Sequence, residues 1–266
     1  MKKQNDLPIM ILTIGVFGIL NTEMGMVGIL PFVAEKFHVS ISQAGLLVSL
    51  FALVVAISGP TMPLLFSGID RKKVMLLVLG IFTAGIIVAI FASNFIIALL
   101  ARVIPAFFHP IYCSLAFSVA AASVKPEESP KAVAKVFIGV SAGMVIGVPI
   151  SNFLAAAASL EMSMAFFVTA LAWLATFFWI PAMPVKKKLS YGEQVRVLKN
   201  SVTWVSLIAV LLMNGAVFGV FSYLAKYLDT VTHFSWNTIS LLLFVYGMAN
   251  ILGSMLAGRL LTQNAN

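Results

Sequence analysis

Residues 136–149 read VFIGVSAGMVIGVP, an apolar stretch in which Gly139, Gly143 and Gly147 recur at strict four-residue spacing before Pro149. Glycines spaced in this way lie along one side of a helix and form a groove that lets a second helix approach closely. Generic helix packing also accounts for the spacing. The stretch belongs to a longer apolar run over residues 132–158, which is long enough to cross a lipid bilayer as a helix.

The composition of the whole chain agrees with membrane insertion. Of 266 residues, 61% are hydrophobic and 10% are charged, whereas an ordinary soluble domain carries about 25% charged residues. The mean hydropathy is +1.05. A soluble fold of this size leaves roughly a quarter of its surface exposed and could not hide so much apolar area. The composition therefore excludes a soluble enzyme, a disordered chain and a nucleic-acid-binding protein, and the single cysteine, Cys113, excludes a disulfide framework.

Eight apolar runs are long enough to span the membrane as helices, each of which needs about 20 residues. The predicted spans cover residues 7–32, 43–66, 74–93, 95–123, 132–158, 163–184, 201–225 and 238–261. These runs lack the period-two alternation that marks the strands of a membrane barrel. The sequence therefore predicts an all-α polytopic membrane protein.

The positive charges predict which ends of the spans face the cytoplasm, because Lys and Arg gather in cytoplasmic loops. Fourteen of the 17 basic residues lie on one side of the predicted spans: Lys2, Lys3, Arg71, Lys72, Lys73, Lys125, Lys131, Lys135, Lys186, Lys187, Lys188, Arg196, Lys199 and Arg259. The opposite loops hold Lys36 and Lys226, and Arg102 lies within a span. This asymmetry predicts a multi-pass protein of the cytoplasmic membrane with a cytoplasmic N-terminus. It also explains the net charge of +8 as topology, without a nucleic-acid partner.

The chain also contains an internal repeat, visible where His38-Val39-Ser40 and His233-Phe234-Ser235 stand 195 residues apart. Each of these triplets precedes an apolar run, and further similar residues follow at the same offset. A repeat unit of about 195 residues with six helices would give a complete chain of about 390 residues and twelve helices. The expectation is therefore a truncated or incomplete product that stops two helices into its second unit. The alternative is a genuine eight-helix protein.

Glu23 lies about two thirds of the way along the first predicted span, directly after Asn21 and Thr22. An ionisable side chain in the hydrocarbon core costs at least ~2.5–3.5 kcal/mol on insertion scales, so it is a functional candidate. Desolvation favours the neutral carboxyl, which predicts that Glu23 binds a proton or a cation. The alternative is a polar residue near the outer end of its helix that reaches water.

Arg102 and His109 lie seven residues apart in the fourth predicted span, and therefore on one helical face. Arg102 keeps its charge and needs a carboxylate, backbone carbonyls or water as its partner. We expect it to pair with an acid such as Glu23 in a polar stripe facing a central cavity. Imidazole ordinarily changes charge near neutral pH, so Glu23, Arg102 and His109 are the candidate proton-coupling residues. Asn21, Glu23 and His109 are the candidate substrate contacts.

Arg102 and His109 each also have an interpretation without a functional role. Arg102 lies only about seven residues from the start of its predicted span, so its side chain could extend to the nearer membrane interface. A lone histidine in a membrane helix is often a satisfied structural residue. Pro105 and Pro110 remove backbone donors on either side of this face and predict a kink.

A basic turn joins the second and third predicted spans, where Asp70 precedes Arg71, Lys72 and Lys73. This turn serves the charge asymmetry described above. A second hypothesis makes Asp70, Arg71 and Lys72 a cytoplasmic gating loop, in which charges fasten and release helix ends during a transport cycle.

The sequence predicts no metal site, cofactor site or catalytic centre. The three histidines at positions 38, 109 and 233 are far apart, and no glycine-rich phosphate-binding loop is present. Serine, histidine and acidic residues form no hydrolase pattern. We therefore expect a protein that is not an enzyme.

The chain resembles a major facilitator superfamily transporter of the drug/proton antiporter branch, which includes sugar, purine and drug efflux proteins. Four stretches carry the resemblance: Thr22-Glu23 with Gly28-Ile29-Leu30-Pro31; the loop Asp70-Arg71-Lys72; Arg102 with Ala106, His109 and Pro110; and Gly139, Gly143, Gly147 and Pro149, which are similar to the antiporter motif of the fifth helix. The last of these is the most specific, and it favours efflux over uptake. The resemblance covers eight of the family's usual twelve helices.

The resemblance implies a major facilitator fold with substrate bound between two six-helix halves near the midplane. Residues 1–184 would form the N-terminal six-helix bundle, residues 185–200 a cytoplasmic linker, and residues 201–266 the first two helices of the second bundle. The implied function is proton-coupled export of a small molecule by alternating access, with a small-molecule substrate, protons and the lipid bilayer as partners.

Two alternatives remain open at this point. One is an inactive fragment, or one half of a split transporter whose partner is a separate C-terminal fragment. The other is a membrane sensor or scaffold that binds a ligand without moving it. The identity of the substrate does not follow from the residues.

Overall fold

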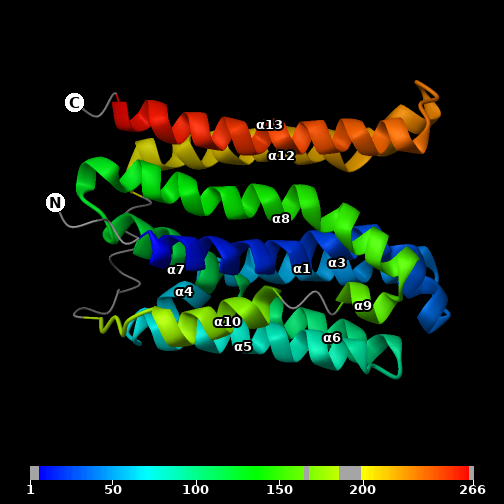
Figure 1. Ribbon diagram of the computed structural model, residues 1–266, viewed down its shortest axis with the longest axis horizontal. Coiled ribbons are helices and arrows are strands. Elements are labelled where there is room, and N and C mark those ends of the chain that lie inside the picture. Colours follow the sequence, from blue (N-terminus) through cyan, green and yellow to red (C-terminus); the bar gives the residue numbers. More distant parts are fainter. Residues whose placement is uncertain (1–5, 165–167, 186–198, 264–266) are drawn as a thin grey trace. The chain divides into compact units, whose positions relative to one another are not determined.

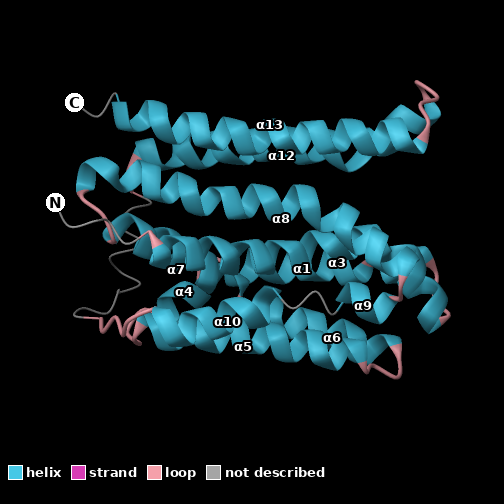
Figure 2. Cartoon of the chain, in the orientation of Figure 1, coloured by secondary structure: helices cyan, strands magenta, loops and turns pink. Residues whose placement is uncertain are grey.

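The computed structural model describes residues 6–164, 168–185 and 199–263, and these residues form helices joined by loops, without strands (Figure 2). In chain order the helices are α1 (Leu7–Phe37), α2 (Ile41–Ala44), α3 (Leu46–Ser58), α4 (Met62–Leu65), α5 (Arg71–Ile90), α6 (Phe95–Ala106), α7 (His109–Ala122), the short 3₁₀ helix η1 (Pro126–Glu128), α8 (Ser129–Ala157), α9 (Leu160–Met164), α10 (Val168–Trp179), α12 (Ser201–Thr230) and α13 (Trp236–Gln263). The predicted all-α class is confirmed.

Six helical segments in the described part of the chain are long and apolar enough to cross a membrane. They cover Leu7–Val27, Ile41–Ser58, Arg71–Ile90, Phe95–Ala122, Pro126–Ala155 and Leu160–Trp179, and they match the first six predicted spans. The seventh and eighth predicted spans are also helical, as α12 and α13, with shorter described apolar stretches over Ser201–Val217 and Phe244–Ala257. The chain is therefore a multi-pass membrane protein.

The fourth span is divided where two prolines stand. Helix α6 contains Pro105 and ends at Ala106, and α7 begins at His109 with Pro110 in its first turn. Proline lacks the amide hydrogen that an unbroken helix needs and its ring opposes the preceding turn, so the interruption follows from these residues. The predicted kink is confirmed, whereas α8 continues past Pro149 to Ala157.

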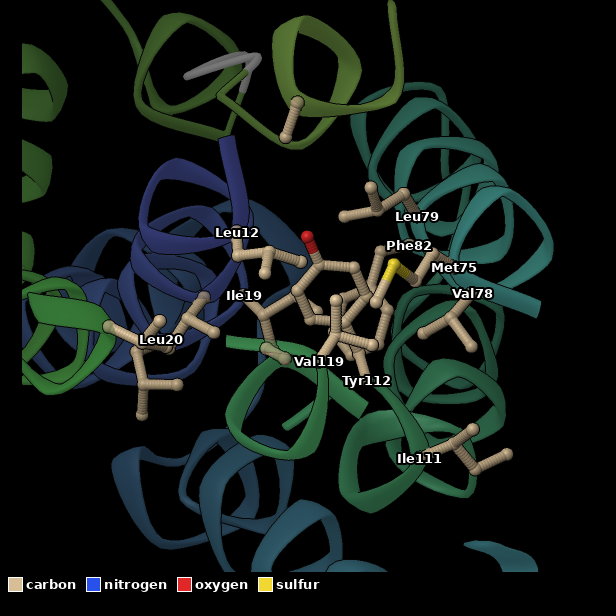
Figure 3. Close-up of a cluster of buried hydrophobic side chains, with 14 of the residues drawn as sticks. Leu12, Ile19, Leu20, Met75, Val78, Leu79, Phe82, Ile111, Tyr112 and Val119 are labelled. Atoms are coloured by element: carbon tan, nitrogen blue, oxygen red, sulfur yellow. The ribbon is translucent and has the colours of Figure 1, made fainter. Parts of the chain in front are cut away.

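Helix α1 is the element around which the first ten helices pack (Figure 1). It contacts α8 along much of its length and also meets α10, α7, α2, α3, α9 and α5. Side chains from α1, α5 and α7 form the largest buried apolar cluster (Figure 3). Because lipid is as apolar as these side chains, close packing rather than burial from water stabilises such contacts in a membrane.

The two members of the sequence repeat adopt the same local conformation. His38 and His233 have left-handed backbones with φ of 53° and 54°. In each case the following serine precedes a helix, and its hydroxyl accepts a hydrogen bond from the amide three residues later, 3.1 Å for Ser40 and 3.3 Å for Ser235. The offset of 195 residues therefore relates two equivalent helix starts.

The chain divides into two compact units, residues 1–185 with 247–266 and residues 186–246. Helices α1 to α10 and the turns between them belong to the first unit and contain every residue of the candidate site. The division into residues 1–184, 185–200 and 201–266 stays a prediction. Six basic residues that support the predicted orientation lie outside the described residues: Lys2, Lys3, Lys186, Lys187, Lys188 and Arg196.

Candidate functional site

The glycine groove of α8 lies directly against the backbone of α1. A Cβ atom on Gly139 would collide with the carbonyl oxygen of Thr13, and one on Gly143 would lie 2.7 Å from Cβ of Leu20. At Gly147 the same atom would lie 3.2 Å from Oδ1 of Asn21. The spacing of the glycines thus permits backbone contact over about two turns, and α1 is the helix that the groove accepts.

Arg102 of α6 reaches from the other side to the backbone of α1. Its guanidinium donates three hydrogen bonds to carbonyl oxygens: Nε to Leu47 at 2.8 Å, Nη1 to Thr22 at 2.9 Å and Nη2 to Glu23 at 2.9 Å. The residue is only 6% exposed, so the interpretation in which its side chain extends to the membrane interface is wrong. The rigid fork of arginine suits such a set of acceptors, and it ties α6 to α1 and α3.

The carboxylate of Glu23 points to His109 and not to Arg102. Its Oε2 atom lies 3.3 Å from Nε2 of His109, and both side chains are largely buried, with 19% and 11% of their surfaces exposed. The contact is at ion-pair distance without the angular geometry of a hydrogen bond, and both ring nitrogens of His109 lack a hydrogen-bond partner among the described residues. The predicted pair of Arg102 with the Glu23 carboxylate is therefore replaced by a bond to the Glu23 carbonyl.

Two aromatic rings enclose this polar cluster. The Phe51 ring centroid lies 4.8 Å from Cζ of Arg102 and 5.8 Å from the His109 ring, which it meets edge to face. The ring centroids of Phe82 and His109 lie 6.4 Å apart. The rings keep the cluster in an apolar setting, where a change of one charge affects its neighbours more strongly than in water.

A cavity of about 60 Å³ lies beside Arg102, lined by α1, α3, α5, α6, α8 and α9. Its polar lining comes from Asn21, Thr22, Arg102, Ser151 and Ser163. Drug-sized ligands occupy pockets of about 300–1,000 Å³. The cavity is therefore large enough for a few water molecules or one small group, and not for a whole drug-sized molecule.

The structure brings together three of the four predicted polar residues of the membrane interior. Glu23, Arg102 and His109 form one cluster, whereas Asn21 lies apart from Glu23 and His109 and lines the cavity beside Arg102. Residues two apart on a helix point in directions about 200° apart, so Asn21 faces α8 while Glu23 faces α7. The candidate substrate contacts Asn21, Glu23 and His109 thus lie on two sides of α1.

The basic turn fastens the start of α5 to the end of α10. Asp70 caps α5 by accepting a hydrogen bond from the amide of Lys73 at 3.1 Å. The amide of Arg71 donates to the carbonyl of Met183 at 3.2 Å, and Nζ of Lys72 donates to the carbonyl of Phe177 at 2.8 Å. A cation at the carboxyl end of a helix is favourable because it meets unpaired carbonyls there. The role of Asp70, Arg71 and Lys72 in gating stays a prediction.

Several residues of the site were not predicted. The carbonyls that hold Arg102 are backbone atoms, which carry no sequence signal. Phe51 and Phe82 are two of 21 phenylalanines, so nothing in the sequence distinguishes them. Ser151 and Ser163 stand as isolated hydroxyls within or beside apolar runs, and the bond from Ser163 Oγ to the Ser151 carbonyl at 2.7 Å shows their proximity.

The sequence model of the Major Facilitator Superfamily matches residues 12–265. The uncharacterized MFS-type transporter YtbD of Bacillus subtilis (strain 168) is 31% identical over 98% of this chain and 67% of its own length. The inner membrane transport protein YdhP of Escherichia coli (strain K12) is 29% identical over 97% of this chain and 67% of its own length. A probable sugar efflux transporter of Helicobacter pylori (strain G27) is 24% identical over 97% and 66%. The chain thus spans about two thirds of the length of these relatives.

Solved structures show the same fold at lower identity. The human organic anion transporter MFSD10 superposes with a TM-score of 0.70 at 18% identity, over 99% of this chain and 74% of that protein. A bacterial homolog of the human lysosomal transporter Spinster superposes with a TM-score of 0.65 at 20% identity, over 97% and 60%. With a family match over nearly the whole sequence and the fold in agreement, the chain belongs to the Major Facilitator Superfamily.

Proposed function

We propose that the chain is part of a proton-coupled secondary transporter that exports a small molecule across the cytoplasmic membrane by alternating access. Relatives described as an inner membrane transport protein and a probable sugar efflux transporter support transport and its outward direction. The N-terminus is cytoplasmic in this proposal, as the distribution of Lys and Arg predicts. The antiporter branch is supported by the glycine groove of α8.

The contact between Glu23 and His109 is the observation that carries the proposal. With both groups charged or both neutral, the pair is neutral overall and suits its apolar surroundings. Loss of one proton leaves a net negative charge beside Phe51 and Phe82. Such a change alters the relative free energies of two transporter conformations if each exposes the pair to water differently.

Arg102 has a different role in this proposal from the one expected. It holds the carbonyls of Thr22 and Glu23 and thereby fixes the part of α1 that carries the proton-binding carboxyl. Arg102 positions Glu23, and the proton is shared between Glu23 and His109.

The test is transport of a panel of sugars, nucleosides and dyes by the 266-residue chain in proteoliposomes with an imposed pH gradient. Glu23→Gln should abolish transport driven by the gradient. Glu35→Gln is the matched control, because Glu35 is also on α1 and is exposed. Equal gradient-driven transport by wild type and Glu23→Gln would overturn the proposal.

The split-transporter alternative has its own outcome in this assay. The chain would be inactive alone and active when co-reconstituted with a polypeptide carrying the last four helices of a relative. A chain that binds a panel compound without moving it in either condition would instead support a sensor.

A further inference from the structure

The cavity beside Arg102 contains a buried cation whose hydrogen bonds are incomplete. The guanidinium has five N–H groups and donates three of them to carbonyl oxygens, which leaves two. Of the described residues that line the cavity, Arg102 alone is charged. A buried charge is costly unless an opposite charge compensates it.

The Glu23 carboxylate is near enough to act on the charge of Arg102, but it lies outside the cavity. The Glu23 carboxylate is directed to His109, on the α7 side of α1, and does not line the cavity. Around the cavity stand uncharged polar groups instead, and the Asn21 side chain, at 4% exposure, carries an NH2 group that can donate to an anion beside an Oδ1 atom that can only accept. Ser151 and Ser163 are each also 4% exposed. Amide and hydroxyl groups can rotate to donate to an acceptor, as an anion requires.

We infer that this cavity binds one small monovalent anion, either a halide ion or the carboxylate of a small molecule, on Arg102 with Asn21 and Ser151 as neutral partners. A volume of about 60 Å³ suits a group of that size. The site lies inside the first helical bundle and is separate from the Glu23–His109 pair.

The anion site and the pair are linked by charge. With Glu23 ionised and His109 neutral, the three groups Arg102, Glu23 and His109 carry no net charge. After one proton binds, whichever of Glu23 and His109 holds it, their net charge is +1 and the anion binds more tightly. By reciprocity the bound anion favours protonation of the pair. This linkage rests on the proposed proton binding at Glu23 and His109.

Other titratable groups near the site do not supply the same effect. Cys113 of α7 lies close enough to Glu23 to interact with its charge. A thiol is ordinarily neutral at neutral and acidic pH, so it does not change charge there. Lys36 and Glu161 compensate each other in a salt bridge of 2.6 Å between α1 and α9. The described cavity-lining residues of α3, α5, α8 and α9 are uncharged.

The experiment measures anion binding to the purified 266-residue chain in detergent, with radioactive chloride in equilibrium dialysis and sodium gluconate as the background salt. Unlabelled acetate competes in a second arm, which distinguishes a site for carboxylates from a site for halides alone. Saturable chloride binding, or saturable binding of labelled acetate, is the expected result. The absence of both overturns the inference.

Two matched variants of α5 locate the site without touching its polar groups. Ala89 lines the cavity, whereas Ala84 lines only the adjoining apolar groove between α5 and α6, which shares Gly85, Ala101 and Pro105 with the cavity. Ala89→Leu should weaken anion binding at least tenfold by filling the cavity, and Ala84→Leu should leave it unchanged. Equal affinities in the two variants would overturn the assignment. Thermal melting of both proteins shows that each is folded.

The pH dependence separates this inference from the proposed function. As the pH is lowered and the Glu23–His109 pair takes up a proton, the wild-type affinity should rise by at most about tenfold per pH unit. Glu23→Gln should bind the anion tightly at both high and low pH. If Ala89→Leu abolished anion binding but pH did not alter it, the anion site would be supported and proton binding at the Glu23–His109 pair would be overturned. Gradient-driven transport that needs Glu23, without anion binding, would overturn this inference alone.

Discussion

The two faces of α1 are stabilised in opposite ways. On the α8 face, glycines bring two backbones together, and the contacts are steric. On the α6 and α7 face, Arg102 and His109 reach across a gap with polar groups, and the contacts are directional. One face of α1 is therefore fixed by close backbone packing, whereas the other is held by polar side chains, among them the two to which the proposed function assigns the proton.

The substitution expected to destabilise the α1–α8 contact most is Gly139→Ala. We call this contact, made by Gly139, Gly143 and Gly147, the glycine face. The new methyl group would collide with the carbonyl oxygen of Thr13, a backbone atom that cannot move independently. Overpacking typically costs 1–3 kcal/mol, so we expect the free energy of unfolding to fall by about 3 kcal/mol. Unfolding by sodium dodecyl sulfate in bicelles, followed by circular dichroism, measures the change.

The control for this variant is Gly80→Ala on α5. A methyl group there would meet Nε1 of Trp173 at 3.5 Å, an ordinary contact distance. Alanine also favours a helix by up to about 1 kcal/mol over glycine. Gly80→Ala should therefore be as stable as wild type or more stable. If the two variants behaved alike, close backbone contact would not be what stabilises the α1–α8 interface.

The polar face is broken by Arg102→Leu, which removes three hydrogen bonds to carbonyls. Bonds to charged groups contribute about 1.5–3 kcal/mol each, and the desolvation of the charge offsets part of the total. We expect a loss of about 2 kcal/mol in the same unfolding assay. Arg102→Lys should recover little, because an ammonium group cannot reproduce the planar fork. A leucine variant as stable as wild type would show that the three bonds only compensate the cost of burying the charge.

Much of the glycine face could be predicted from the sequence, whereas little of the polar geometry could. Four-residue spacing on a helix fixes a groove whatever lies opposite, so the positions of Gly139, Gly143 and Gly147 alone indicate close packing. The rarity of charge in apolar runs likewise identifies Glu23 and Arg102. The partner of each charge could not be inferred, because a guanidinium can donate to backbone carbonyls as well as to a carboxylate, and packing decides which acceptors lie within reach.

The helix break between α6 and α7 explains why the polar contacts differ from those expected. Pro105 and Pro110 predict a bend, but the direction in which His109 then points depends on the packing of α7 against α1 and α5. That packing places His109 on Glu23 and leaves Arg102 with the carbonyls. The opposite position of Asn21 follows from helical geometry alone and could have been predicted from the sequence.

A smaller perturbation touches neither face of α1. Asp70→Ala removes the N-cap of α5 and its bond to the Lys73 amide. Loss of such a cap costs about 1 kcal/mol. Asp70→Asn keeps an acceptor oxygen and should be close to wild type. Equal losses in Asp70→Asn and Asp70→Ala would mean that the charge of Asp70, and not its capping bond, stabilises the turn.

The smallest expected effect is at the far end of α1, where Lys36 and Glu161 form a salt bridge of 2.6 Å. Both side chains are partly exposed, and such pairs contribute about 0.2–1 kcal/mol. Glu161→Gln should lower the free energy of unfolding by about 0.5 kcal/mol at low salt, and less at high salt because ions screen the pair. A loss in the free energy of unfolding as large as that of Gly139→Ala would show that contacts at the end of α1 stabilise it as much as the packing of its faces does.

The most direct test of the central claim is a pH-difference infrared spectrum of the 266-residue chain. The spectrum records protonation of carboxyl and imidazole groups together. As the pH is lowered, the wild type and Glu35→Gln should show one shared change at the Glu23–His109 pair, and Glu23→Gln should lose its carboxyl part and alter its imidazole part. A spectrum of Glu23→Gln identical to that of wild type would contradict the claim that Glu23 and His109 bind the proton together.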